Sequence, residues 1–225
     1  MSLIDLKIGI PHFSGTIVTA RNSNYTVNKA ILDILDGAIS FINKTEGYKL
    51  ITKVKIEDNE GKLDKIIFED NYHLGFENIL CQNESNPFNM AHTRAGHEDD
   101  TETSEFGRGM KFSAIFLAEE FDVYTRVEDK YYKIRFDFNR MRKEKFPNKS
   151  YECTEFREIT VNEYRTYHKD DYGSTLILNK IRDVHRKNNI DVIKDEIEKS
   201  IKGAYSKKLN TYAKQLEIHF NESPI

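Results

Sequence analysis

Hydrophobic and polar residues follow two different periods along the chain, and the longer period predicts helices. Between residues 27 and 42, VNKAILDILDGAISFI, the apolar residues recur every three or four positions, as on the buried face of a helix. The same spacing occurs over residues 109–119 and in IDVIKDEIEKSIKGAYS from about residue 190. A shorter helix is predicted near residues 74–82.

Apolar residues that alternate with polar ones predict the strands. LITKVKI and LDKIIFED are separated by the turn sequence DNEGK, so residues 50–70 indicate a β-hairpin. FDVYTRV and YYKIRFDF predict a second hairpin, and further strands are expected near residues 151–160, in GSTLILNKI and in LEIHFNE. The stretch from Gln82 to Ser104 is polar and has no period, which is typical of a lid or of disorder.

Composition limits the class of protein. The chain has 225 residues, 38% of them hydrophobic, which is enough for one or two domains with a real core. Its 34 basic and 37 acidic residues give no bias toward polyanions. No apolar run reaches the length of a membrane span, and Cys81 and Cys153 lack the CxxC spacing of a zinc site. We therefore expect an intracellular protein, cytoplasmic or nuclear, without a membrane partner.

Residues 105–113, EFGRGMKFS, indicate a candidate anion site. Gly107 and Gly109 allow the backbone to approach a ligand closely, and they precede a predicted helix. The free N–H groups and the dipole of a helix N-terminus favour negative charge, and Lys111 adds a cation. A phosphate chain is the obvious ligand. The alternative is a tight turn before a helix of the core.

The polar side of the first predicted helix is the second candidate. Asp33, Asp36, Gly37 and Ser40 have the i, i+3, i+4, i+7 spacing of one stripe. These side chains are short and acidic, and a glycine within a helix costs about 1 kcal/mol relative to alanine. Small residues along a helix face indicate that something bulky lies against it. The alternative is a solvated face.

The order of these elements resembles the nucleotide-binding domain of gyrase, heat-shock chaperones, histidine kinases and MutL, known as the GHKL or Bergerat fold. FGRGMKFSA and FDVYTR are most similar to the MORC and MutL branch. The resemblance implies an α+β fold: a two-layer α/β sandwich with a mixed, mostly antiparallel sheet, helices on one face and a long ATP lid. It implies a nucleotide-binding domain over residues 1–182. Residues 183–225 would be a C-terminal helix and strand that begin a second, transducer-like domain.

The resemblance also assigns roles along the first helix. Asp33 takes the place of the family's glutamate that orients the attacking water, and Gly37 takes the place of its Mg²⁺-binding asparagine. Ser40 replaces a further aspartate. The implied cofactors are ATP and Mg²⁺, but the metal position at Gly37 is degenerate, so Asp33 or Asp36 would have to supply the metal ligand.

Further positions of the family pattern are expected to bind the nucleotide. Asp70 matches the aspartate that accepts a hydrogen bond from the adenine amino group. Tyr72 stands where a glycine belongs, and Gly75 matches the next glycine with one extra residue. The remaining candidates for nucleotide contact are Asp36, Gly37, Ser104, Gly107, Arg108, Gly109, Met110, Lys111, Ser174 and Thr175.

The positions that keep the family pattern favour nucleotide binding, whereas those that depart from it weaken the expectation of ATP hydrolysis. Asp70 and the glycine loop favour ATP and ADP binding, whereas shortening the base to Asp33 moves its carboxylate by about 1 Å, which can cost roughly 10²-fold in rate. The predicted function is a divergent ATP-binding domain that forms a homodimer on nucleotide binding, with slow or absent ATP hydrolysis. The alternatives are an inactive pseudo-ATPase used as an interaction scaffold, and a nucleic-acid-binding module that uses YYKIRFDFNRMRKEKF. Nucleic acid is not the expected partner of this domain.

Overall fold

The computed structural model describes residues 13–45, 47–80, 87–88, 109–143, 153–186 and 189–225. Its α-helices are α1 (Phe13–Arg21), α2 (Val27–Ile39), α3 (Gly109–Leu117), α4 (Phe138–Lys143), α5 (Val161–Tyr167) and α6 (Ile190–Thr211). The short 3-10 helices are η1 (Ile42–Lys44) and η2 (Asp183–His185). The strands are β1 (Leu50–Asn59), β2 (Lys62–Asp70), β3 (Ala118–Val127), β4 (Lys130–Asp137), β5 (Glu155–Ile159), β6 (Ser174–Ile181), β7 (Leu216–Phe220) and β8 (Ser223–Pro224).

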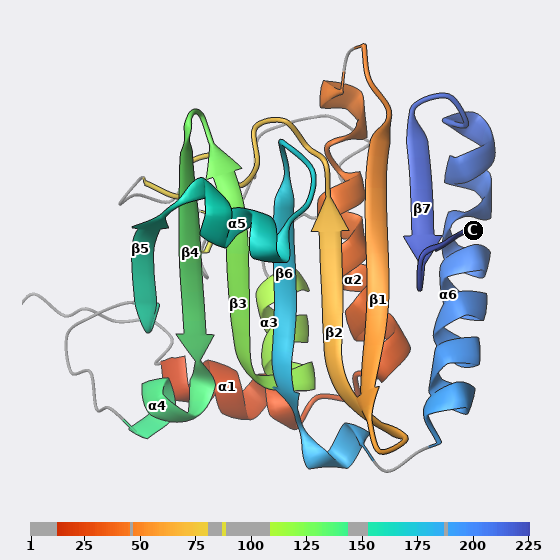
Figure 1. Cartoon of the computed structure of the whole chain (residues 1–225). Helices are drawn as coiled ribbons and strands as arrows, with labels where there is room; N and C mark the ends of the chain where they lie inside the picture. The colour runs from red at the N-terminus through yellow and green to blue at the C-terminus, as the bar shows by residue number, and fades with distance from the viewer. Residues whose placement is uncertain (1–12, 46, 81–86, 89–108, 144–152, 187–188) are drawn as a thin grey trace, which may run out of the picture.

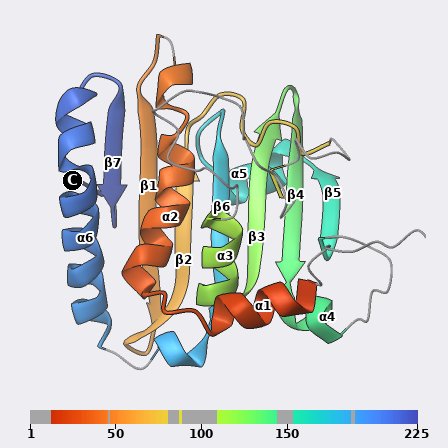
Figure 2. The same ribbon diagram turned by 180° about the vertical axis from the view of Figure 1, so that it is seen from behind.

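The strands form one sheet in the order β5-β4-β3-β6-β2-β1-β7-β8. Neighbouring strands are antiparallel except β1 and β7, which are parallel. Helices α1, α2 and α3 lie behind the sheet in Figure 1 and in front of it in Figure 2. The predicted α+β sandwich with a mixed, mostly antiparallel sheet is therefore confirmed.

Helix α2 forms where the apolar spacing predicts it. Thr26 caps its N-terminus, because the Thr26 hydroxyl accepts a hydrogen bond from the Lys29 N–H at 3.2 Å. Of the residues on the predicted apolar face, the helix buries Ala30, Ile31, Ile34 and Leu35, and it also buries Ile39, which was not expected there. The helix ends at Ile39, three residues before the predicted end. Its apolar face packs on the sheet. The surroundings of its polar stripe therefore depend on the elements that lie next to the helix.

Other predicted elements differ from the structure in their bounds. The helix expected near residues 74–82 is wrong for the described part up to Leu80, which forms turns. Gly75 has a φ of +57°, a left-handed conformation that a right-handed helix cannot include. Helix α3 ends at Leu117 rather than at residue 119, because Ala118 already pairs with Ile181 of β6. Helices α1, α4 and α5 had not been predicted, and α4 and α5 are too short to show a clear period.

The sheet carries a core on each face. The larger core lies under α1, α2 and α3. The smaller one consists of Tyr124, Ile159, Tyr164 and Ile177. Helix α5 lies on the opposite face from α2, over β3, β4 and β6 in Figure 1. The expectation that helices cover one face holds for α1–α3, and the short α5 is the exception.

The C-terminal elements extend the same sheet. Strand β7 pairs with β1, and α6 buries Ile197 and Ile201 completely. A division between residues 1–182 and 183–225 stays a prediction. Within the described ranges, none of the helices combines the length and the apolar character that crossing a membrane requires.

Candidate functional site

A pocket lies between α2 and the ends of β2 and β6. It holds about 990 Å³ of empty space, its open mouth included. Its apolar walls include Ile34, Phe41, Phe68, Phe76 and Leu176. The pocket brings together the following residues named from the sequence: Asp33, Gly37, Ser40, Asp70, Gly75, Met110 and Ser174.

Asp33 faces the pocket from α2, and its carboxylate is already hydrogen-bonded. The Tyr25 hydroxyl donates to Asp33 Oδ2. Burial, followed by the neighbouring Asp33 carboxylate, raises the pKa of Tyr25 to about 12, so the phenol keeps its proton at neutral pH. Tyr25 was not identified from the sequence. It lies in the turn before α2. Its hydroxyl is hydrogen-bonded to one of the two carboxylate oxygens of Asp33, the candidate catalytic base.

Gly37 lies one helical turn further along and leaves the pocket open. A Cβ placed at Gly37 would have no atom within 4 Å outside its own helix backbone and chain neighbours. The Ser40 hydroxyl donates to the Gly37 carbonyl at 2.7 Å and so closes the end of the helix. The position that would hold the family's asparagine therefore has room for a larger side chain.

Asp36 points away from the pocket. Its Oδ1 accepts a hydrogen bond from the Tyr205 hydroxyl of α6 at 2.8 Å, and burial raises the pKa of its carboxyl group. Tyr205 also donates to the Leu32 carbonyl at 3.1 Å. The predicted acidic stripe thus divides, because Asp33, Gly37 and Ser40 face the pocket whereas Asp36 anchors α6.

Asp70 ends β2 and lines the pocket opposite α2. Its Oδ1 accepts from the Tyr72 N–H at 3.0 Å, and in the sheet it pairs with Ser174. Burial raises the pKa of the Asp70 carboxyl to about 7, although the backbone hydrogen bonds from Tyr72 and Ser174 act in the opposite direction. In its ionised form, this carboxylate is a strong acceptor for an amino group that enters the pocket.

Two glycines allow neighbouring segments to pack closely around Asp70. A Cβ at Gly75 would lie 2.0 Å from the Arg126 carbonyl oxygen, and a Cβ at Gly173 would lie 1.8 Å from the Asp70 carbonyl oxygen. Both glycines have positive φ, +57° and +116°. Gly173 was not named as a site residue, although the sequence GSTLIL contains it.

Thr125 of β3 connects β6 to the segment after β2 at the Asp70 end of the pocket, and it was also missed. Its Oγ1 lies 2.8 Å from Ser174 Oγ and accepts from the Phe76 N–H at 3.0 Å. Thr125 occurs in FDVYTR, a stretch that carries the family resemblance, so the signal was present. Ser174 is turned to the pocket, whereas Thr175 faces the other side of the sheet and hydrogen-bonds to His168.

Helix α3 begins beside Asp33. A Cβ at Gly109 would be in van der Waals contact with Asp33, at 3.6 Å from its carbonyl oxygen, and Met110 lines the pocket. The Lys111 side chain is buried, and its Nζ donates to the Pro87 carbonyl at 3.0 Å. Ser104, Gly107 and Arg108 lie outside the described residues, as does the predicted lid apart from residues 87–88.

The pocket suits a nucleotide better than a metal ion. An aromatic and aliphatic slot with one carboxylate at its floor matches adenine, whose amino group needs an acceptor. Among the residues that the structure describes, no three His, Cys, Asp or Glu side chains come close enough to hold a metal. Mg²⁺ requires several oxygen ligands, and Gly37 supplies no side-chain oxygen beside the hydrogen-bonded Asp33. On the α2 side of the pocket, the described residues offer Mg²⁺ one carboxylate, that of Asp33, so phosphate and water oxygens would have to supply most of the ligands.

Comparison with known proteins adds an independent observation. The sequence model of the family described as histidine kinase-, DNA gyrase B-, and HSP90-like ATPase matches residues 25–173, more than half of the chain. The matched range includes Asp33, Gly37 and Asp70, and it ends at Gly173. None of the proteins of curated function is significantly similar in sequence.

Proposed function

Because the chain belongs to the histidine kinase-, DNA gyrase B- and HSP90-like ATPase family, we propose that the pocket between α2, β2 and β6 binds ATP and hydrolyses it slowly or not at all. The adenine amino group donates to Asp70, with Ser174 beside it. The phosphates extend toward the start of α3 and the Asp33–Gly37 side of α2. The observation that carries the proposal is the placement of Asp70 at the floor of an apolar pocket, across from Gly37.

Slow turnover follows from the polar groups at the phosphate end. Asp33 is one methylene shorter than a glutamate, and Tyr25 occupies one of its oxygens. A water molecule aligned for attack requires a base at hydrogen-bond distance, so both features lower the rate. Gly37 offers no ligand to Mg²⁺, the metal that would neutralise the charge developing on the phosphates.

The second candidate is a pseudo-ATPase that uses the nucleotide-filled pocket as an interaction scaffold. The hydrogen bond between Tyr25 and Asp33 favours it, because that bond satisfies the carboxylate without any water or nucleotide. Release of phosphate by the wild-type chain separates a slow ATPase from a scaffold. Formation of a homodimer on nucleotide binding, a closer relation to the MORC and MutL branch and an intracellular location stay predictions.

Calorimetric titration with ATP and with adenosine tests the site. Asp70→Asn replaces an acceptor with an amide that can present a donor to the adenine amino group. The variant should lose about 1.5–3 kcal/mol of binding free energy, the value of a hydrogen bond to a charged group. Asp36→Asn is the matched control, since Asp36 sits on the wall helix but bonds to Tyr205, and it should bind ATP as the wild type does.

Two results would contradict the proposal. A wild-type chain that binds neither ATP nor adenosine would remove the nucleotide function. Equal affinities of the wild type and Asp70→Asn would remove Asp70 from the site.

A further inference from the structure

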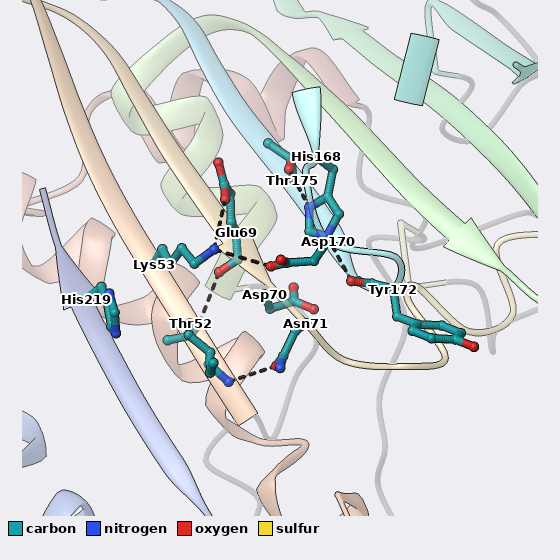
Figure 3. Close-up of polar contacts among 12 residues, drawn as sticks. Thr52, Lys53, Glu69, Asp70, Asn71, His168, Asp170, Tyr172, Thr175 and His219 are labelled. Carbon is teal, nitrogen blue, oxygen red and sulfur yellow. Dashed lines mark hydrogen bonds and ion pairs between the residues drawn. The ribbon is translucent and has the colours of Figure 1, made fainter. Parts of the chain in front are cut away.

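A buried hydrogen-bonded cluster lies directly behind Ser174, on the face of the sheet away from the pocket. His168, the residue after α5, has no exposed surface. Its Nε2 lies 2.8 Å from the Tyr172 carbonyl oxygen and its Nδ1 lies 2.9 Å from Thr175 Oγ1, as the dashed lines in Figure 3 show. The imidazole ring thereby ties the loop after α5 to the start of β6.

The loop after α5, residues 168–173, packs directly against the backbone of Asp70. Gly173 packs so tightly against β2 that only a residue without Cβ fits there, as shown by the 1.8 Å approach to the Asp70 carbonyl oxygen. From the other side, the Tyr164 hydroxyl donates to the Gly173 carbonyl at 3.0 Å. Figure 3 shows Asp70 and Thr175 on the neighbouring strands β2 and β6, with His168 beside Thr175. A shift of the loop therefore moves the adenine end of the pocket.

The chemistry of the partners determines which groups in the cluster donate hydrogen bonds and which accept them. A carbonyl oxygen only accepts, so His168 Nε2 must donate to Tyr172. Burial lowers the pKa of His168, which leaves the ring neutral at pH 7 and makes Nδ1 an acceptor. The Thr175 hydroxyl is then the donor to Nδ1, and the Tyr167 carbonyl at 3.1 Å competes for the same hydrogen. The cluster thus depends on one hydroxyl and one ring.

Resting on the proposed nucleotide site, we propose that His168 and Thr175 are positioning residues for adenine. They touch no ligand themselves. They hold Gly173 and Ser174 against Asp70, so that the carboxylate and the Ser174 hydroxyl stay in register with the base. The family resemblance implies that Thr175 contacts the nucleotide directly. In the role proposed here, Thr175 acts on the adenine only through Gly173 and Ser174.

Titration with adenosine tests the inference, because this probe reports the base end of the site and carries no phosphate. Thr175→Val keeps the shape of the side chain and removes the hydroxyl, whereas Thr175→Ser keeps the hydroxyl. We expect Thr175→Val and His168→Phe each to weaken adenosine binding about tenfold, the equivalent of one lost hydrogen bond. Thr175→Ser should bind within about twofold of the wild type, because the donor to Nδ1 remains. The double variant should weaken binding by less than the product of the two single losses, since both single variants remove the hydrogen bond between Thr175 and His168 Nδ1.

His185→Phe is the matched control. His185 is a partly buried histidine whose ring Nε2 lies 2.9 Å from the Phe116 carbonyl oxygen, and it follows the far end of β6. Its replacement should leave adenosine affinity unchanged. If His168→Phe does not fold, the comparison of Thr175→Val with Thr175→Ser carries the test.

Failure of the inference differs from failure of the proposed function. Wild-type affinity in both Thr175→Val and His168→Phe would overturn the positioning role and leave the nucleotide site intact. Equal loss in the Val and Ser variants would also overturn it, because the hydroxyl would then be irrelevant. A wild-type chain that binds ATP but no adenosine would overturn this inference alone, and one that binds neither would overturn the proposed function and this inference together.

Discussion

At the scale of single residues, Gly37 is the position where the resemblance implies a metal-binding asparagine. A Cβ there meets no atom within 4 Å beyond its own helix and chain neighbours, so an asparagine side chain has room to enter the pocket. Asparagine is also a slightly better helix former than glycine, by a few tenths of a kcal/mol. Restoration of the metal ligand is therefore sterically allowed, and its effect depends on the polar groups around it.

We predict that Gly37→Asn makes ATP binding dependent on Mg²⁺, and that adding Asp33→Glu raises phosphate release. Asparagine would supply an oxygen ligand to the metal, and glutamate would regain the missing methylene, so each change restores a separate requirement. ATP affinity and phosphate release are measured across a magnesium titration. Gly203→Asn is the control, since Gly203 lies in α6 with equal space around it. A wild type with normal magnesium dependence and a restored variant that is no faster would contradict the prediction.

At the scale of elements, the pocket depends on how the segment after β2 docks on β3. Gly75 approaches the Arg126 carbonyl so closely that a methyl group would lie 2.0 Å from it, and its φ is positive. The next residue, Phe76, hydrogen-bonds to Thr125 through its N–H. The glycine therefore allows the segment after β2 to lie directly against β3 beside the pocket.

Gly75→Ala should destabilise the fold by about 2 kcal/mol or more, because alanine adds both a clash and a strained backbone. Gly37→Ala is the matched control within α2, and it should stabilise the fold by up to about 1 kcal/mol through its helix propensity. Urea unfolding measures both. Two variants with the same stability would show that the close approach at Gly75 is not needed.

At the scale of the whole molecule, the ionisation of Asp70 makes the free energy of unfolding depend on pH. An aspartate in an unfolded chain has a pKa near 3.9, whereas burial raises the pKa of Asp70 to about 7 in the fold. Between these values the folded state binds more protons than the unfolded state. Stability from this group is therefore complete below about pH 4 and is lost as the pH rises to about 7, by at most about 1.4 kcal/mol per pH unit.

Asp70→Asn should flatten this slope. The variant should be more stable than the wild type at pH 8, and the difference should shrink toward pH 4, where the carboxyl is protonated in the folded wild type and about half protonated in the unfolded chain. Urea unfolding of the nucleotide-free chain at pH 4.5, 6 and 8 measures it. Parallel pH profiles for the two proteins would mean that the pKa of Asp70 is not raised in the fold.

The sequence by itself determined the local elements and much of the candidate site. Apolar spacing predicted α2, the β1–β2 and β3–β4 hairpins and β6, because periodicity and turn residues act over a few neighbours. The resemblance named Asp33, Gly37 and Asp70, and all three line one pocket in the structure. These inferences succeeded because each depends on contacts within one element or on a short motif.

Only the tertiary structure decided which polar residues meet. Helical spacing put Asp33 and Asp36 on one stripe, but packing of α6 through Tyr205 turned Asp36 to a different neighbour. Alternation could not choose between Ser174 and Thr175 until helix α5 covered the far face of β6 and buried Thr175. Contacts such as these join residues far apart in the chain, and their geometry follows from the packing of whole elements, which no local pattern encodes.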